Sequence, residues 1–505
     1  MNNSYWTSTI IENKKKYPKL DKKIEADITI IGGGLTGITT AYYLTKSGVK
    51  VTLLEKDKIA NHTSGNTTGK ITSQHGLFYN YLLQSVGKEQ AKQYLYANEE
   101  AIQNIAKIIE EEKIECEFEW QDNYVYAQTE ENLKKINAEH EALEFLNFKN
   151  SEIIEKADIP IKNLGAIKFK KQAQFNPCLY ALALAEKVEE RGGQIFEDSK
   201  VIDIKKEDEE YEIITEDGKV YSKVVVICTH YPIINAPGFY FLKMYQSTSY
   251  IIAVETKAKL FDGMYINAED DVISLRTAKY KDKRLVLIAG MDHKTGAKID
   301  LRNSYRKLEE TANKLFPGCK VIYRWNAEDC IPLDKIPYIG EFSNLWPNVY
   351  VGTGYKKWGI TSSNVAANII TDKILEKKNP YEEVFTSTRL KPIKNYKELG
   401  NMLKEVAYSE VINKLRATDE HVRDIKQGEA KIIDIAGKKV GIYRDKAGSL
   451  FAVKPYCTHL GCELSWNNLE NTWDCPCHGS RFTYEGKSIY DPAIKDLEIY
   501  YIDKQ

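Results

Sequence analysis

The sequence lacks long apolar runs, an excess of charge of either sign and an apolar segment near its start. Its 71 Lys and Arg residues nearly equal its 72 Asp and Glu residues, so the net charge is −1. This balance gives no electrostatic reason to expect binding to nucleic acid. Apolar runs such as 224–228 fall far short of the ~20 residues that a membrane-spanning helix needs. Because the Lys-rich residues 1–27 contain no secretory signal, we expect a cytoplasmic protein without a membrane span.

Cysteine is sparse over most of the chain and concentrated near one end. Five cysteines are scattered over the first 450 residues: Cys116, Cys178, Cys228, Cys319 and Cys330. The other four lie within 21 positions: Cys457, Cys462, Cys475 and Cys477. A secreted disulfide-rich domain would spread its cysteines through a short chain. The concentration seen here favours a metal site.

A glycine-rich turn near the start predicts a dinucleotide site. Strand, helix and strand patterns follow one another at 27–31, 35–46 and 49–54. Gly32, Gly34 and Gly37 fit the G-x-G-x-x-G pattern, whose glycines let a pyrophosphate approach the backbone at a helix N-terminus. Glu55, 18 residues after Gly37, is placed to bind a ribose and disfavours a 2′-phosphate. These residues alone do not distinguish FAD from NAD.

Residues 26–57 resemble the FAD-binding start of the D-amino-acid-oxidase-like superfamily, which includes glycine and sarcosine oxidases. Segments that resemble the family's other FAD contacts follow in order: the turn with Ser64, Asn66, Thr67 and Gly69; 175–177 before a helix; Val201; Gly340; and the closing loop with Gly354, Gly359, Ile360 and Thr361. The resemblance covers about 24–376 and implies an FAD cofactor held by these residues. No second strand–glycine–helix unit for NAD(P)H is visible, and NAD as the main cofactor remains a minor alternative.

The C-terminal cysteines alternate with histidines in a specific pattern. Cys457 and His459 form C-x-H, Cys475 and His478 form C-x-x-H, and fifteen residues separate the two pairs. Two sulfurs and two imidazoles suit a 2Fe–2S cluster with the cysteines on one iron and the histidines on the other. The charges of two ferric ions, two sulfides and two thiolates cancel, and the two neutral imidazoles add no negative charge. The cluster is therefore easier to reduce than one held by four thiolates. A zinc site is the alternative, but the usual C-x2–4-C and H-x3–5-H pairs are absent.

This pattern closely resembles the Rieske family in its respiratory-complex form, over about 417–505. The resemblance implies that Cys457, His459, Cys475 and His478 bind the cluster, that Cys462 and Cys477 form a disulfide, and that Ser480 donates a hydrogen bond to a bridging sulfide. Phe482 stands where this family often has Tyr. The missing hydroxyl predicts a lower cluster potential than in Tyr-bearing relatives.

The two resemblances define the predicted fold. We expect an α/β Rossmann-type FAD-binding domain (about 24–83, 165–240 and 330–376) interleaved with a substrate domain (about 84–164 and 241–329) that contains an antiparallel sheet. A linker with a helix (377–416) then leads to a small all-β Rieske domain (417–505).

The remaining histidines exclude a ring-hydroxylating oxygenase. That class needs a mononuclear iron held by two histidines and a carboxylate. The six other histidines are isolated in the sequence: His62, His75, His140, His230, His293 and His421. None shows the D-x2-H-x4-H spacing of that family. His62 and His75 lie near the turn that contains Ser64 and Gly69, here called the flavin turn. Covalent flavin attachment is one interpretation of these histidines, and a loop or hydrogen-bonding role is the favoured one.

The flavin-domain resemblance implies oxidation of a C–N bond in an amine or amino-acid-like substrate. Arg276 and Arg324 are candidates to bind a substrate carboxylate, because Arg pairs with carboxylates in bidentate fashion. Tyr245 and Tyr250 are candidates to line the pocket. Lys356 and Lys357 in the closing loop are candidates to stabilise the negative charge of reduced flavin. A purely structural or solvated role is the alternative for each of them.

The fusion of a two-electron flavin domain to a one-electron cluster domain predicts a dehydrogenase that passes electrons singly to an external carrier. A simple oxidase, which gives its electrons to O2, has no use for the cluster. Two alternatives stay open at this point. An external donor could load the cluster so that the flavin reduces a substrate, or the chain could be a non-catalytic electron-transfer module.

Overall fold

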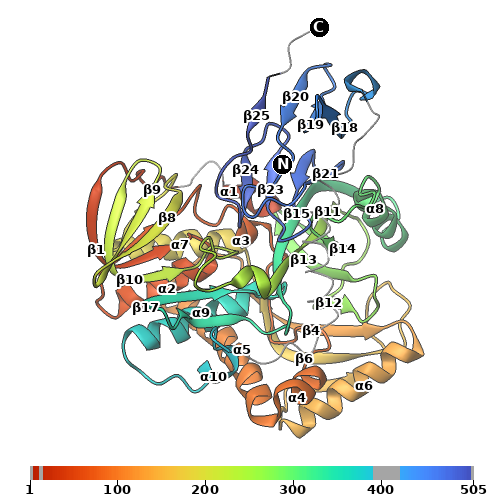
Figure 1. Cartoon of the computed structure of the whole chain (residues 1–505). Coiled ribbons are helices and arrows are strands. Elements are labelled where there is room, and N and C mark those ends of the chain that lie inside the picture. The colour runs from red at the N-terminus through yellow and green to blue at the C-terminus, as the bar shows by residue number, and fades with distance from the viewer. Residues whose placement is uncertain (1–3, 11–14, 390–420, 502–505) are drawn as a thin grey trace.

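Two large sheets organise the first part of the chain, and two small sheets form its C-terminal end (Figure 1). The structure, a computed structural model, describes residues 4–10, 15–389 and 421–501. The predicted linker helix within 377–416 therefore lies outside the described residues from 390 onward, as do both ends of the predicted 417–505 domain. Within these ranges, no helix has the length and apolar character needed to cross a membrane.

The first sheet carries the glycine-rich turn. Its strands are β1 (Lys23–Ile31), β2 (Val51–Leu54), β7 (Gln194–Phe196), β8 (Val201–Glu207), β9 (Glu210–Thr215), β10 (Lys219–Ile227), β16 (Tyr338–Ser343) and β17 (Trp346–Thr353). The central strands β17, β10, β1, β2 and β7 run parallel to one another. All four residues of β2 are buried, as expected for a parallel strand that is covered on both faces.

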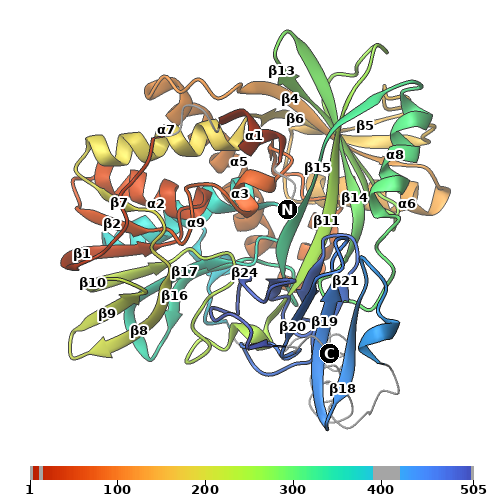
Figure 2. The ribbon, with the colours of Figure 1, turned by 90° about the horizontal axis from the view of Figure 1, so that it is seen from above.

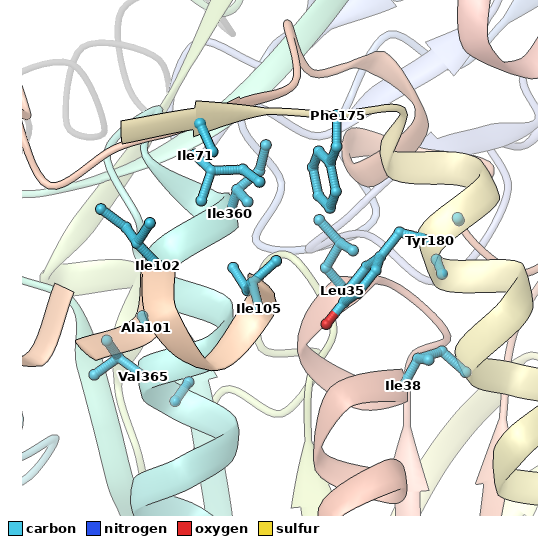
Figure 3. Close-up of a cluster of buried hydrophobic side chains, with 14 of the residues drawn as sticks. Leu35, Ile38, Ile71, Ala101, Ile102, Ile105, Phe175, Tyr180, Ile360 and Val365 are labelled. Atoms are coloured by element: carbon cyan, nitrogen blue, oxygen red, sulfur yellow. The ribbon is translucent and has the colours of Figure 1, made fainter. Parts of the chain in front are cut away.

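Four helices pack together beside this sheet: α2 (Leu35–Lys46), α5 (Lys88–Glu111), α7 (Pro177–Glu190) and α9 (Gly359–Ile374). Figure 3 shows side chains from all four helices meeting in one apolar core, among them Leu35, Ile105, Tyr180 and Ile360. Burial of each large apolar side chain contributes roughly 1.5–3 kcal/mol. The start of α7 explains the motif at 175–177, because Asn176 accepts from the amides of Cys178 and Leu179 and Pro177 opens the helix.

The second sheet forms the other wall of the flavin domain. Its strands are β3 (Lys70–Ile71), β4 (Glu119–Ala127), β5 (Ser151–Ile154), β6 (Gly165–Gln174), β11 (Met244–Glu255), β12 (Met264–Asn267), β13 (Ile273–Tyr280), β14 (Lys283–Lys294) and β15 (Lys320–Pro332). The strands β13, β14, β11 and β15 form the predicted antiparallel part. The strand β6 pairs with β4, so it lies in this sheet although 165–240 is predicted to bind FAD.

Further helices complete the flavin domain: α1 (Tyr5–Ile10), α3 (Thr63–Asn66), α4 (Tyr79–Val86), α6 (Glu130–Phe145), α8 (Ser304–Leu315), α10 (Glu382–Phe385) and the 3-10 turn η1 (Tyr240–Leu242). The turn α3 contacts β15 and α7. This contact places the residues after His62 between the two large sheets.

Within residues 421–501, the C-terminal part consists of strands and loops apart from the 3-10 turn η3 (Val422–Asp424). One small sheet contains β18 (Ala430–Ile435), β19 (Lys438–Arg444), β20 (Leu450–Val453) and β25 (Ile499–Tyr500). The other contains β21 (Ser465–Asn467), β22 (Thr472–Asp474), β23 (Arg481–Thr483) and β24 (Ser488–Tyr490). Both views place β23 and β24 close to β11 and β15 (Figures 1 and 2). The predicted fold class, a mixed α/β flavin domain with a small all-β C-terminal domain, is confirmed.

Candidate active site and metal centre

The glycine-rich turn joins β1 to α2 and leaves no room for side chains. Gly32 has a φ of +107°, which favours glycine, and a Cβ on Gly37 would lie 1.9 Å from the Gly32 carbonyl oxygen. Glu55 follows β2, and its carboxylate accepts from the amides of Gly33 at 2.6 Å and Asp57 at 2.9 Å. The Leu35 amide, at the first turn of α2, donates to the Ser64 hydroxyl at 3.0 Å. This close-packed cradle with an acidic end fits the pyrophosphate and ribose of FAD.

A cavity of about 550 Å³ extends from this cradle to the second sheet. Most of the predicted FAD contacts line it: Gly32, Gly34, Glu55, Ser64, Asn66, Thr67, Val201, Gly354, Gly359 and Ile360. Val201 and Glu55 lie at the end of the cavity next to the first sheet. The 63–68 turn and the 354–360 loop lie toward the second sheet. The lining therefore has the elongated, two-ended character that a dinucleotide cofactor requires.

Four of the predicted cofactor residues do not line the cavity. Gly37 packs α2 against the turn. Gly69 has a φ of +78°, and its carbonyl accepts from Arg276. Thr361 donates to the Thr72 carbonyl, and Gly340 lies near Lys373 and Ser387.

The two lysines of the closing loop both line the cavity. Lys356 and Lys357 have φ values of 49° and 71°, an uncommon backbone conformation for side-chain-bearing residues. The Lys356 ammonium lies 3.8 Å from the centre of the Phe78 ring, and burial lowers its pKa to about 7. The Lys357 ammonium forms an ion pair with Asp292 at 2.5 Å. Both stay candidates for interaction with bound flavin or substrate.

Neither predicted arginine is placed to bind a substrate carboxylate. The buried Arg276 guanidinium donates to the carbonyls of Thr68 at 2.9 Å and Gly69 at 2.6 Å, so it holds the flavin turn in place. Arg324 pairs with Glu309 at 2.6 Å. Neither residue lines the cavity. The interpretation of Arg276 as a substrate anchor does not fit this geometry, because backbone carbonyls already occupy its donors.

The tyrosine candidates lie on opposite faces of β11. Tyr245 lines the cavity. Tyr250 is fully buried, stacks on His293 with ring centres 5.7 Å apart, and does not line it. Strand alternation explains the difference, since odd- and even-numbered residues of a strand point to opposite faces. Tyr250 therefore does not fit the predicted role in the pocket.

The two histidines near the flavin turn have protein partners. His75 is buried, and its two ring nitrogens contact the Tyr94 hydroxyl at 2.6 Å and the Thr72 carbonyl at 2.9 Å. Burial lowers the pKa of His75 to about 3, so this ring is neutral near pH 7. His62 lines the cavity and contacts the Asp57 carboxylate. These contacts support the hydrogen-bonding interpretation of both residues.

The candidate metal centre lies between two loops of the C-terminal domain. One loop joins β20 to β21 and carries Cys457 and His459; the other joins β22 to β23 and carries Cys475 and His478. A disulfide between Cys462 and Cys477 links the two loops. The histidine rings are perpendicular, with centres 5.0 Å apart. The Ser480 hydroxyl contacts the Cys457 sulfur and accepts from the Ala493 amide.

Within the described residues, the imidazole nitrogens that would bind a cluster lack hydrogen-bond partners. The Nδ1 atoms of His459 and His478 are buried and make no hydrogen bond within the described part of the chain. Cys457 and Cys475 are buried, unlinked thiols in contact with each other. Buried polar atoms without partners are costly and rare in folded proteins. Two orphaned imidazole nitrogens beside two thiols therefore fit a 2Fe–2S cluster with two Cys and two His ligands.

The strands β11 and β15 separate the cavity from the metal centre. Ser247, Ser249, Ala327 and Asp329 line the cavity on one face. On the other face, Gln246 donates to the His478 carbonyl at 3.1 Å and to the Asp491 carbonyl at 2.6 Å. The fit is close, because a Cβ on Gly479 would lie 2.4 Å from the Gln246 Cβ. One layer of sheet thus carries the cavity wall and the docking site of the C-terminal domain.

A buried ionic network fixes this docking. Arg481 of β23 donates to Glu328 of β15 at 2.7 Å and to Asp474 at 3.1 Å. The Glu328 carboxylate also accepts from the hydroxyls of Thr248 and Thr295. The sequence gives no local signal for this pair, because 152 residues separate Glu328 from Arg481 and each is a common surface residue type.

The C-terminal domain also contributes to the cavity itself. Tyr490, Asp491 and Ile494 are among the lining residues. Lys56 contacts Asp491 at 3.4 Å, and the Asn66 amide contacts the Tyr490 hydroxyl at 3.4 Å. Near the candidate metal centre, His459 Nε2 is hydrogen-bonded to Asn235 of the flavin domain, and the Phe241 ring lies edge-on to His459 and His478. Both domains of one chain thus line the cavity.

The comparisons with known proteins agree with these two sites. Residues 27–373 match the family described as FAD dependent oxidoreductase, and residues 417–501 match the Rieske [2Fe-2S] domain. The chain is 39% identical over 497 residues to a Rieske 2Fe-2S iron-sulfur protein of Bacillus subtilis, YhfW, covering 98% of this chain and 97% of that protein.

Two further relatives cover the flavin part. The gamma-glutamylputrescine oxidoreductase of Escherichia coli is 23% identical, over 70% of this chain and 85% of its own length. The crystal structure of glycine oxidase from Geobacillus kaustophilus superposes with a TM-score of 0.63 at 18% identity, covering 73% of this chain and all of that one. The latter similarity shows a shared fold.

Proposed function

Because the chain belongs to the FAD-dependent oxidoreductase family and ends in a Rieske [2Fe-2S] domain, we propose that it is a dehydrogenase of amines or amino-acid-like molecules. It oxidises a C–N bond and delivers the electrons one at a time to an external carrier. When bound, FAD takes up two electrons and a Rieske cluster carries one at a time. The residues predicted to hold the two cofactors lie on opposite faces of β11 and β15, which supports this proposal.

The observation that carries this proposal is the docking of the cluster loops on the outer face of the cavity wall. Gln246 contacts the carbonyl of the cluster ligand His478, while its neighbours Tyr245 and Ser247 line the cavity. An oxidase that gives its electrons to O2 needs no such arrangement. The E. coli relative is named for an amine substrate, which supports a C–N bond as the site of oxidation.

The test is anaerobic mixing of the purified protein, loaded with both cofactors, with a panel of amines and amino acids. We expect the flavin absorbance to fall first and the cluster to become reduced afterwards, with EPR as the readout of the cluster. If no member of the panel bleaches the flavin but a reduced ferredoxin does, electrons flow in the opposite direction. If neither reagent has an effect while dithionite reduces both groups, the catalytic proposal fails.

A further inference from the structure

The charged side chains on the cavity wall indicate which charge the substrate has. The wall that β11, β14 and β15 form contributes Asp292 and Asp329 to the lining, and the closing loop contributes Lys357. Asp329 lies opposite Ser247 in the register of β15 and β11. Both point to the cavity face of the strands, away from the docked C-terminal domain. These groups therefore face whatever molecule occupies this end of the cavity.

Asp329 is the carboxylate of this wall without a partner. Lys357 forms an ion pair with Asp292, whereas the Asp329 side chain makes no hydrogen bond or ion pair within the described residues. Its nearest charged neighbours are Lys357 and Asp292. One lysine between two carboxylates leaves the group with a net negative charge. A partly buried, uncompensated charge is unfavourable, and a cationic ligand would offset it.

The other lysines of the cavity are directed elsewhere. Their partners are, in turn, Asp491 for Lys56, the Tyr265 carbonyl for Lys70, the Tyr81 ring for Lys335 and the Phe78 ring for Lys356. Lys200 adjoins Val201 at the end of the cavity that Glu55 marks. No arginine occurs among the lining residues that the structure describes. The second sheet thus offers a cation site and lacks the bidentate anchor that suits a carboxylate.

We propose that Asp329, backed by the Asp292–Lys357 pair, binds the ammonium group of a cationic amine, so that the preferred substrates are amines without an α-carboxylate. This inference rests on the proposed function and narrows it. An α-carboxylate next to the ammonium group would face Asp329 and Asp292, and like charges at close range repel each other.

Matched substrate pairs test the inference on the unmodified protein. Each pair consists of an amino acid with a single amino group and the amine that remains after removal of its carboxylate: alanine and ethylamine, valine and isobutylamine, proline and pyrrolidine. The readout is the second-order rate constant of anaerobic flavin bleaching. We expect the reactive amines to exceed their amino acids by at least about tenfold, the usual value of one charge-assisted contact.

A binding measurement that needs no turnover tests the residue itself. tert-Butylamine has no hydrogen on the carbon next to nitrogen, so it can bind but cannot be oxidised. Its dissociation constant is measured by titrating the flavin spectrum of the loaded protein. We expect Asp329→Asn to weaken binding about tenfold or more, while Asp270→Asn, at an exposed position outside the lining, leaves it unchanged. Circular dichroism and flavin content verify that each variant is folded.

The outcomes separate this inference from the proposed function. If amino acids bleach the flavin as fast as their amines, or if folded Asp329→Asn binds tert-butylamine like the unmodified protein, the inference is overturned and the dehydrogenase proposal stands. If neither amines nor amino acids bleach a flavin that dithionite reduces, both are overturned. The pair comparison remains decisive even if Asp329→Asn fails to fold.

Discussion

The Arg481 guanidinium donates to the Glu328 carboxylate across 2.7 Å, and both side chains are fully buried. This contact joins β23 of the cluster domain to β15 of the flavin domain. Thr248 and Thr295 donate to the Glu328 carboxylate, and Asp474 and Thr472 accept from the Arg481 guanidinium. Since an ion pair of this kind is costly to bury without such partners, the interface has a single favourable register.

Removing one member of the pair should destabilise the protein strongly. Arg481→Met leaves the Glu328 charge buried without compensation, and we expect a loss of about 3–5 kcal/mol in the free energy of unfolding. Denaturant titration measures it. The double variant Glu328→Gln/Arg481→Met should recover part of the loss, because Glu328 is then neutral and Asp474 keeps its hydrogen bonds from Asn467 and Thr472.

The exposed pair of Arg306 and Glu310 provides the matched control. Arg306→Met should change the free energy of unfolding by less than about 0.5 kcal/mol, since surface ion pairs contribute little. Equal losses in Arg481→Met and Arg306→Met would contradict the role given to the buried pair.

The hydrogen bond from His459 to Asn235 should tune the cluster. With Nδ1 on iron, the Nε2 hydrogen of His459 points to the Asn235 amide oxygen. An acceptor at this position raises the basicity of the imidazole and favours the oxidised cluster. Asn235→Leu should therefore raise the midpoint potential in an EPR-monitored redox titration. Asn313→Leu, at an exposed position on α8, should not. An unchanged or lower potential in Asn235→Leu would rule out this coupling.

A hydroxyl at position 482 should raise the cluster potential as well. Phe482 is fully buried in β23, next to the loop that carries Cys475 and His478. In the related Rieske proteins a Tyr here supplies a hydrogen bond toward a cysteine sulfur, and such a bond stabilises the reduced cluster. Redox titration of Phe482→Tyr is expected to show an upward shift. If the shift is absent while flavin and cluster contents are normal, the resemblance at this residue has no functional meaning.

Amine binding should weaken in acid. Burial raises the pKa of Asp329 to about 6, although the positive charge of Lys357 acts in the opposite direction. The carboxylate is thus ionised above pH 6 and loses its charge as the pH falls through 6. The charged groups nearest to it are Lys357 and Asp292. His230, which also lines the cavity, is neutral over this range, because burial lowers its pKa to about 4. The affinity for tert-butylammonium should therefore be constant above about pH 7 and fall below pH 6.

The same titration on Asp329→Asn serves as the control for this pH dependence. The variant should bind weakly and show little change between pH 5 and pH 8, since it has no carboxylate to protonate at this position. An unmodified protein that binds the amine equally well at pH 5 would exclude Asp329 as the binding group.

The local parts of the fold could be predicted from the sequence. The helix over 35–46 follows directly from the glycine turn and coincides with α2. Asn176 and Pro177 start α7 through their own capping chemistry. The cluster ligands are also local, because their spacing within two loops defines the donor set. Each of these features depends on residues that are close together in the chain.

The features that depend on tertiary packing could not be predicted. Alternation along β11 separates Tyr245 from Tyr250, but the sequence does not reveal which face meets the cavity and which meets the cluster domain. The residue type of Arg276 suits a carboxylate anchor, but its partners are the carbonyls of Thr68 and Gly69. These lie more than 200 positions away in the sequence, so no local pattern reveals them. The role proposed for Asp329 can be recognised only once Lys357 is known to pair with Asp292.

The central claim is that electrons from a substrate pass from the flavin site to the cluster of the same chain. The most direct measurement is a single anaerobic turnover with a reactive amine at several protein concentrations, followed by flavin absorbance and by EPR of rapidly frozen samples. The account predicts that the cluster becomes reduced after the flavin, with a rate constant that does not depend on protein concentration. A cluster that stays oxidised, or a rate that rises in proportion to protein concentration, would contradict it.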